Sequence, residues 1–275
     1  MATNGTRKSI RNPNPPVEDN VFKSFRLDGK TVIITGGSGG IGYEVARGLA
    51  EAGANVHRDM VLCLNNRSKA SRDHRQRLQC QDRNIQVQVE NYAEVEGSVA
   101  SVVKDFGRLD VMIANAGIPS KAGGLDGTVA DWDRVRAVDF DGAYHCARAA
   151  GLVFKAQGYG NCIFTASMSG HAANVPQEQS CYNACKAGVI HLSKSLAVEW
   201  AKWGGRVNSV SPGYIDTAIS GDCPFEMKEA WYDLTPLKRD ADPRELKGVY
   251  LYLASDASSY TTGADFAVDG GYTAR

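Results

Sequence analysis

Residues 32–42 read VIITGGSGGIG, an apolar run rich in β-branched side chains that leads into a turn rich in glycine. The run from Thr31 to Ile34 predicts a strand buried on both faces of a parallel sheet. Glycines after such a strand let backbone N–H groups close on a pyrophosphate at the positive end of the next helix. The spacing is Thr-Gly-x-x-x-Gly-x-Gly rather than Gly-x-Gly-x-x-Gly, so a plain tight turn is the alternative interpretation.

The composition predicts one domain that acts on a small molecule. The chain has 275 residues, and its 31 basic side chains balance 31 acidic ones, so neither nucleic acid nor an anionic membrane is expected as a partner. No apolar run approaches the ~20 residues of a membrane span and the N-terminus has no apolar signal core, which favours a cytoplasmic protein. The seven cysteines are scattered, which favours free thiols and no metal site.

Strand and helix patterns alternate along the chain, which predicts an α/β fold with a parallel, doubly wound sheet of Rossmann type and helices on both faces. About seven strands are expected, over residues 31–34, 61–64, 85–89, 109–114, 161–166, 206–210 and 266–268. Helices are expected over residues 41–52, 95–106, 131–157, 181–203 and 246–255. Residues 1–24 are polar and contain three prolines, so we expect a flexible arm ahead of a single domain over residues 25–275.

Residues 57–92 fit this pattern least well. The polar run over residues 65–83 has little apolar periodicity, so the helix expected between the second and third strands is poorly defined. A solvated excursion and an altered or wrongly translated segment are both compatible with this sequence.

Tyr182 and Lys186 are four residues apart, which places both on one face of the expected helix. A free phenol has a pKa near ~10, and a neighbouring Lys⁺ and a cationic nicotinamide would both lower that pKa by favouring the phenolate. Such a pair suits acid–base chemistry near neutral pH. Two solvated side chains are the alternative interpretation, but this helix follows a strand that ends in serine.

Two serines compete for the position beside this pair. We favour Ser167, because it stands first after the strand in a Ser-x-x-Gly turn, and Ser169 is the alternative. Either hydroxyl would donate a hydrogen bond to the substrate oxygen as negative charge develops there during hydride transfer.

With these motifs the chain resembles the short-chain dehydrogenase/reductase family over residues 27–273. The resemblance implies that Tyr182 is the proton donor or acceptor, that Lys186 lowers its pKa and binds the cofactor ribose, and that Ser167 orients the substrate. The matching motifs also include Asn115-Ala116-Gly117, Pro212-Gly213 and Asp269-Gly270-Gly271. The cofactor lining that the resemblance implies is Gly36, Ser38, Gly40, Ile41, Gly42, Asn115, Tyr182, Lys186, Pro212, Ile215 and Thr217.

Residues 164–171, 181–183, 195–200, 211–217 and 261–265 look like the fungal and yeast polyol and carbonyl reductases of this family. That likeness implies a ketose/polyol pair or a small hydroxy-ketone as substrate, and a homotetramer paired through the long helices. A ketoreductase of a secondary-metabolite pathway and a catalytically silent nucleotide-binding protein are the alternatives.

The chain departs from the wider family at two positions. Asp139 stands where the family often has Asn in a proton relay, so it is either a catalytic relay residue or only a helix-bending residue. Gln88 stands where the family usually places an Asp against the adenine.

NADP(H) is the expected cofactor. An acidic residue at the end of the second strand would bind the ribose 2′-hydroxyl and repel a 2′-phosphate, whereas Asn65 and Arg67, with Asn66 and Lys69 beside them, would accept that phosphate. Ordinary solvated loop charges are the alternative interpretation of Arg67 and Lys69.

Overall fold

The computed structural model describes residues 17–57, 87–218, 220 and 223–274. Within these residues six parallel strands form one sheet in the order β2-β1-β3-β4-β5-β6. The strands are β1 (Thr31–Ile34), β2 (Asn55–His57), β3 (Val111–Ala114), β4 (Gly160–Thr165), β5 (Gly205–Pro212) and β6 (Asp265–Val268). The winding direction reverses between β1 and β3, and sheets of this kind bind ligands at that point, beyond the carboxyl ends of the strands.

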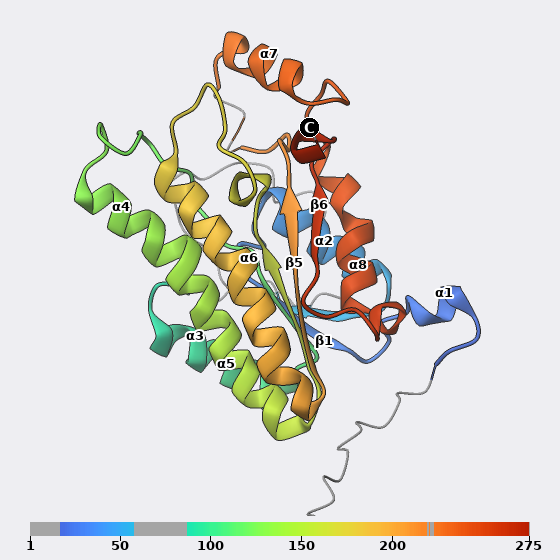
Figure 1. The fold of residues 1–275 in the computed structure, drawn as a ribbon. Helices are drawn as coiled ribbons and strands as arrows, with labels where there is room; N and C mark the ends of the chain where they lie inside the picture. Colours follow the sequence, from blue (N-terminus) through green and yellow to red (C-terminus); the bar gives the residue numbers. More distant parts are fainter. Residues whose placement is uncertain (1–16, 58–86, 219, 221–222, 275) are drawn as a thin grey trace, which may run out of the picture.

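Helices cover both faces of this sheet, as expected for a Rossmann-type fold (Figure 1). One face carries α3 (Tyr92–Phe106), α4 (Val129–Arg136), α5 (Gly142–Gln157) and α6 (Ser180–Trp200), and the other carries α2 (Gly40–Glu51) and α8 (Lys247–Ala254). The helix α7 (Phe225–Leu234) lies beyond the carboxyl ends of β5 and β6, and α1 (Val21–Ser24) lies apart from the sheet. Short helical turns complete the fold: a π-helix, η2 (Ala137–Asp141), and the 3₁₀ turns η3 (Met168–Gly170), η4 (Ala201–Trp203), η5 (Pro243–Leu246), η6 (Asp256–Ser258) and η7 (Tyr272–Ala274).

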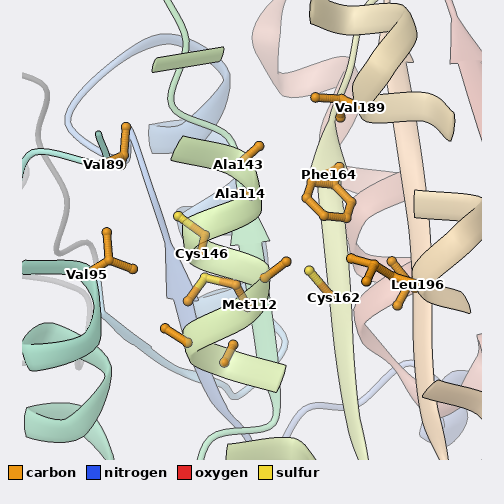
Figure 2. Close-up of a cluster of buried hydrophobic side chains, with 14 of the residues drawn as sticks. Val89, Val95, Met112, Ala114, Ala143, Cys146, Cys162, Phe164, Val189 and Leu196 are labelled. Atoms are coloured by element: carbon orange, nitrogen blue, oxygen red, sulfur yellow. The ribbon is translucent and has the colours of Figure 1, made fainter. Parts of the chain in front are cut away.

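The alternation of side chains along the central strands builds a separate core on each face. Met112 and Ala114 of β3 join the cluster under α3, α5 and α6, whereas Val111 and Ile113 join the cluster under α2 and α8. Figure 2 shows the first cluster, in which Cys146 of α5 approaches Met112. Apolar residues on both faces of every central strand therefore account for the continuous hydrophobic runs in the sequence.

The edge of the sheet near β2 differs from the sequence prediction. The second strand is Asn55–His57, and the expected strand over residues 61–64 lies outside the described residues. The third strand predicted over residues 85–89 is wrong for its described part, residues 87–89, which have no strand geometry. Val87 and Val89 are instead buried in the core beside α3 and α5, and the carbonyl of Val89 accepts a hydrogen bond from Nδ1 of His145. The described sheet accordingly has six strands rather than seven.

Three helical segments also differ from the prediction. The single helix predicted over residues 131–157 is divided into α4, the π-helix η2 and α5. The sequence predicted no helix at α7, although Trp231 of that helix is buried. At the N-terminus, the side chain of Asn20 caps α1, so the described end of the expected arm contains one helical turn. The domain boundary at residues 24–25 stays a prediction.

None of the helices within the described residues has the length and apolarity required to cross a membrane.

Candidate active site

The polar motifs gather beyond the carboxyl ends of the strands. β1 runs into the glycine turn at residues 36–42, β3 ends next to Asn115, and β4 is followed by Ser167. Lys186, in the second turn of α6, donates a hydrogen bond from Nζ to the backbone oxygen of Thr165 over 3.1 Å. That bond fixes the start of α6 against the end of β4.

Tyr182 and Lys186 lie on the same face of α6, as their spacing predicts. Nζ of Lys186 lies 5.4 Å from the centre of the Tyr182 ring. Lys186 is buried, whereas Tyr182 is partly exposed. An ammonium group in this position places a positive charge beside a phenol that a ligand can still reach.

Asp139 is the ion-pair partner of Lys186. Its Oδ1 lies 3.1 Å from Nζ of Lys186, and both side chains are buried. Its Oδ2 accepts a hydrogen bond from the backbone N–H of Ile118 over 3.0 Å. Gly117 borders the pair so closely that a Cβ there would lie 2.7 Å from Oδ1 of Asp139. Asp139 lies within the π-helix η2. It is therefore part of the irregular helical segment and also the ion-pair partner of Lys186.

Burial and charge act in opposite directions on the pKa values of these groups. Burial raises the pKa of Tyr182 above its ordinary value, although the charge on Lys186 and a hydrogen bond with Ser167 act to lower it. Burial acts to lower the pKa of Lys186, but the nearby Asp139 and Tyr182 outweigh it and the pKa is raised. Burial raises the pKa of Asp139 against the opposing charge of Lys186. Lys186 therefore keeps its proton at neutral pH and is a fixed cation beside Tyr182.

The two candidate serines have different partners. Ser167 interacts with Tyr182 through its side chain, and its Oγ also accepts a hydrogen bond from the backbone N–H of Ser169 over 3.1 Å. Oγ of Ser169 accepts a hydrogen bond from Nε2 of Gln179 over 3.1 Å. The geometry thus favours Ser167 as the hydroxyl next to the phenol, because Ser167 interacts with Tyr182 whereas the hydroxyl of Ser169 is bonded to Gln179.

The glycine turn after β1 fits tightly against the end of β3. Oγ1 of Thr35 accepts hydrogen bonds from the backbone N–H groups of Asn115 and Ala116 over 2.8 and 2.9 Å. A Cβ at Gly42 would lie 2.4 Å from the oxygen of Gly36 and 2.6 Å from Nδ2 of Asn115, so only glycine fits there. Gly36 has a φ of +66°, which also favours glycine.

The outer side of the same turn is open. Ser38, Gly39 and Gly40 are exposed, and within the part of the chain that the structure describes no side chain caps the N-terminus of α2. A Cβ at Gly39 would have no heavy atom of a described residue within 4 Å. A tight turn that leaves the first N–H groups of a twelve-residue helix uncapped fits a bound pyrophosphate better than a plain loop.

The remaining predicted lining residues follow β5, which ends at Pro212. Ile215 is buried and pairs with Ala241 through a parallel bridge. Thr217 lies over the glycine turn, because a Cβ at Gly40 would be 3.3 Å from Cγ2 of Thr217. These contacts bring the segment after β5 to the open side of the turn.

Comparison with known proteins identifies the family. The family model described as enoyl-(acyl carrier protein) reductase matches residues 36–273. An NADP-dependent mannitol dehydrogenase of Hypocrea jecorina is 47% identical over 271 residues, which cover 96% of this chain and 100% of the relative. The chain belongs to the short-chain dehydrogenase/reductase family. A sorbose reductase of Schizosaccharomyces pombe is 48% identical over 257 residues, or 91% of this chain and 98% of the relative.

Solved structures of the short-chain dehydrogenase/reductase family share this fold. The NADPH-dependent 3-quinuclidinone reductase from Rhodotorula rubra superposes with a TM-score of 0.87 at 38% identity. The match covers 97% of this chain and 99% of that structure.

Two predicted parts of the cofactor site are not tested by the geometry described above. Asn65 and Arg67, predicted to accept the 2′-phosphate, lie outside the described residues. Gln88, predicted near the adenine, is exposed and donates its backbone N–H to Oε2 of Glu94 over 2.8 Å.

A group of amide and aromatic side chains at the same edge of the sheet was not predicted from the sequence. Asn174 and Gln177 both donate hydrogen bonds to the hydroxyl of Tyr214, whose ring stacks on Trp231 with centroids 4.1 Å apart. Nε1 of Trp231 in turn donates to Oε1 of Gln177 over 2.8 Å. The run from Asn174 to Gln179 directly precedes the Tyr182 helix, and its high amide content was the feature that could have revealed this group.

Proposed function

We propose that this short-chain dehydrogenase/reductase transfers hydride between NADP(H) and a ketone or secondary alcohol, with a ketose/polyol pair as the substrate. The mannitol dehydrogenase and the sorbose reductase, 47% and 48% identical to this chain, support both the cofactor and the substrate class. The observation that carries the proposal is the arrangement of Ser167, Tyr182 and the buried Asp139–Lys186 ion pair at one edge of the sheet.

These residues have distinct tasks in the reaction. NADPH, when bound along the glycine turn and beside Lys186, would supply the hydride for the carbonyl carbon. Tyr182 donates its proton to the carbonyl oxygen during reduction and takes a proton from the hydroxyl during oxidation. Lys186 stabilises the phenolate form of Tyr182, and Ser167 donates a hydrogen bond to the oxygen as charge develops on it.

Asp139 completes the set as a positioning residue. A lone ammonium group buried beside Tyr182 would be costly, because it would leave water without a compensating charge. The ion pair with Asp139 supplies that charge and holds Nζ of Lys186 against β4. In this mechanism Asp139 acts through Lys186 rather than on the substrate.

The residues around the glycine turn fit a dinucleotide. The uncapped start of α2 and the exposed Ser38 would bind the pyrophosphate, since backbone N–H groups at a helix N-terminus favour anions. Lys186 would bind the nicotinamide ribose, and the cofactor lining would continue through Ile41, Asn115, Pro212, Ile215 and Thr217. We propose Asn65 and Arg67 as the acceptors of the 2′-phosphate.

Binding titrations of NADPH and NADH to the purified protein test this function first. We expect NADPH to bind at least about tenfold more tightly, because a 2′-phosphate forms charge-assisted hydrogen bonds with an arginine. Turnover with fructose, sorbose, xylulose and an aryl hydroxy-ketone would follow under saturating NADPH, and we expect the ketoses to be reduced. Equal affinity for both nucleotides would contradict the cofactor, and absence of turnover would contradict the activity.

We further propose that the protein is a homotetramer that pairs through its long helices. The support comes from apolar side chains on the outer surface of α5 and α6. Leu152 of α5 is 51% exposed, Tyr144 of the same helix is 41% exposed, and Val198 of α6 is 80% exposed. Apolar surface of this kind on neighbouring helices is typical of subunit interfaces.

The cytoplasm is the compartment that we propose for this enzyme. Five cysteines are free thiols in the described part of the chain: Cys146, Cys162, Cys181, Cys185 and Cys223. Free thiols are typical of proteins in a reducing compartment. Fluorescence microscopy of a tagged full-length chain tests this location, and a signal confined to an organelle would contradict it.

A further inference from the structure

A cluster of side-chain amides surrounds Gln179, beside the catalytic serine. Nε2 of Gln179 lies 3.1 Å from Oγ of Ser169, 3.0 Å from Oδ1 of Asn174 and 3.0 Å from Oδ1 of Asn183. We call Ser169, Asn174, Gln179 and Asn183 the amide cluster. Gln179 is the N-cap residue of α6, yet its side chain makes no capping hydrogen bond and turns to this cluster instead.

The numbers of hydrogen-bond donors and acceptors within the amide cluster do not match. An amide nitrogen carries two protons, but three oxygen atoms surround Nε2 of Gln179 at hydrogen-bond distance. Among the described residues, Oε1 of Gln179 accepts no hydrogen bond and Nδ2 of Asn183 donates none. Both side chains are partly exposed, so a ligand can reach them. The cluster therefore presents a free acceptor and a free donor on neighbouring side chains.

The amide cluster is connected to the reacting centre. Ser169 accepts from Gln179 through its hydroxyl and donates through its backbone N–H to Oγ of Ser167. Ser167 in turn interacts with the hydroxyl of Tyr182. Two hydrogen bonds thus separate the amide of Gln179 from the hydroxyl that would contact the substrate oxygen. A group bound at the cluster would lie near the carbon that accepts hydride.

The other side of the amide cluster is held rigidly. The side chain of Asn174 is buried, and its Nδ2 donates to the hydroxyl of Tyr214 over 3.3 Å. Tyr214 stacks on Trp231 of α7 with an angle of 7° between the rings. Asn174 therefore connects the cluster to the segment after β5 and to α7, which fixes the position of Gln179 before a ligand arrives.

We propose that the amide cluster binds a hydroxyl group of the substrate, on a carbon next to the reacting carbon. A hydroxyl group both donates and accepts, so it would donate to Oε1 of Gln179 and accept from Nδ2 of Asn183. A simple ketone lacks this group and would leave both amides unpaired, which lowers its affinity. The inference rests on the proposed function, and it assigns to Gln179 and Asn183 the preference for hydroxylated ketones.

The test is the variant Gln179→Leu, measured with hydroxyacetone and acetone as a matched pair of ketones. We expect the wild-type protein to favour hydroxyacetone in kcat/KM, and we expect the substitution to reduce the ratio of the two kcat/KM values about tenfold. Asn183→Leu should reduce the same ratio, and it provides a second variant if Gln179→Leu fails to fold. Thermal unfolding of each variant checks its folding.

The matched control is Gln157→Leu. Gln157 forms hydrogen bonds with the backbone of Leu109 through both ends of its amide, at the opposite edge of the sheet. The control therefore loses amide hydrogen bonds as well, but its substrate ratio should stay at the wild-type value. An equal loss of activity toward both ketones in Gln179→Leu would indicate a purely structural role and overturn the proposal. Equal wild-type kcat/KM for the two ketones would also overturn it.

Absence of any ketone reduction by the wild-type protein would overturn the proposed function rather than the binding site. Calorimetric titration of D-mannitol into protein saturated with NADP⁺ then decides the inference separately. Binding that is lost in Gln179→Leu supports the hydroxyl site. Absent binding, or binding unchanged by the substitution, contradicts it.

Discussion

Lys186 is the residue on which the chemistry of this site depends. Its ammonium group is buried, and it is compensated by Asp139 at 3.1 Å and by the backbone oxygen of Thr165. Removal of one partner from a buried ion pair typically costs about 3–5 kcal/mol, because the remaining charge is left without compensation. The enzyme therefore holds a permanent cation beside Tyr182 only because Asp139 is in place.

Replacement of Tyr182 by Phe should reduce kcat by at least about 100-fold, because the variant lacks the proposed proton donor. NADPH affinity should change by less than about twofold, since the ring remains and Lys186 keeps its partners. Steady-state kinetics and a fluorescence titration of NADPH measure the two effects. Tyr144→Phe, an exposed tyrosine of α5, is the control and should keep wild-type activity. Substantial residual turnover in Tyr182→Phe would refute the assignment.

At the residue scale, the sequence predicted what depends on spacing within one helix. Tyr182 and Lys186 are four residues apart, so their shared face follows from helix geometry alone. The sequence left Ser167 and Ser169 as alternatives, because both hydroxyls lie in one short turn, and the contact of Ser167 with Tyr182 favours Ser167. The pairing of Asp139 with Lys186 could not be derived from spacing, since it joins a π-helix to α6.

At the scale of elements, the turn between β1 and α2 gives a direct test of the dinucleotide site. Gly42→Ala should destabilise the protein by about 1–3 kcal/mol, because the added methyl group meets the oxygen of Gly36 and the amide of Asn115. The same substitution should weaken NADPH binding, since the turn must open to accept the methyl group. Chemical denaturation and a NADPH titration measure these effects.

Gly97→Ala in α3 is the control for this substitution. A Cβ at Gly97 would have no heavy atom within 4 Å, so the change should stabilise the helix by roughly 0.5–1 kcal/mol. A lower free energy of unfolding for Gly42→Ala and a higher one for Gly97→Ala would support the steric argument. Equal stabilities would show that the turn has room for a side chain.

The C-terminal turn after β6 should make stability depend on pH. Burial acts to raise the pKa of Asp269, but hydrogen bonds from Thr273 and Gly271 outweigh it and the pKa is lowered. A lowered carboxyl pKa contributes stability that is present above the unfolded value of 3.8 and is lost as the pH falls through the folded value. Asp269→Asn should therefore be less stable than wild type at pH 7, with a difference that shrinks below about pH 4.

Chemical denaturation at several pH values between about 3 and 7 measures this difference. Asp256→Asn provides the comparison, because the carboxylate of Asp256 is exposed and its ion pair with Lys30 is long, at 3.4 Å. A stability difference for Asp269→Asn that stays constant over this range would contradict the argument.

Strands and helices were predicted accurately where a short stretch of sequence defines them clearly. β1 was predicted over residues 31–34 and has these bounds, because its apolar run is short and is ended by glycine. β2 was missed at Asn55–His57, since three residues with one exposed side chain show no clear period. The π-helix η2 was predicted as ordinary helix, because one wide turn leaves the apolar repeats of α4 and α5 in place.

At the scale of the whole molecule, the exposed face of α5 should determine the oligomeric state. Leu152→Asp places a charge within the proposed helix pairing, so light scattering after size exclusion should show a species smaller than the proposed wild-type tetramer. Leu125→Asp, in the loop between β3 and α4, is the control and should remain tetrameric. A wild-type monomer, or an intact Leu152→Asp tetramer, would contradict this interface.

The fold of the whole molecule was predictable because the alternation of strand and helix patterns recurs many times along the sequence. Alternating strands and helices predicted a parallel sheet with two helical layers, and the structure confirms both. The number of strands was not predictable, because Val87 and Val89 have the apolar alternation of a strand but pack beside α3 and α5. In a short segment, residues that are buried in the core without pairing and residues that pair in a strand show the same alternation of apolar and polar side chains.

The wide turn at residues 137–141 sets the rotational phase between two ends of one continuous helical rod. A π-turn bonds residue i to i+5, where an α-turn bonds i to i+4, so η2 takes up one more residue for about the same rotation. If the same residues formed an uninterrupted α-helix, the extra residue would turn α5 by about 100° relative to α4, and Cys146 and Ala147 would rotate away from β3 while α4 kept its contact with α6. The wide turn therefore absorbs one residue of chain length and keeps one end of the rod aligned with the sheet and the other end aligned with α6.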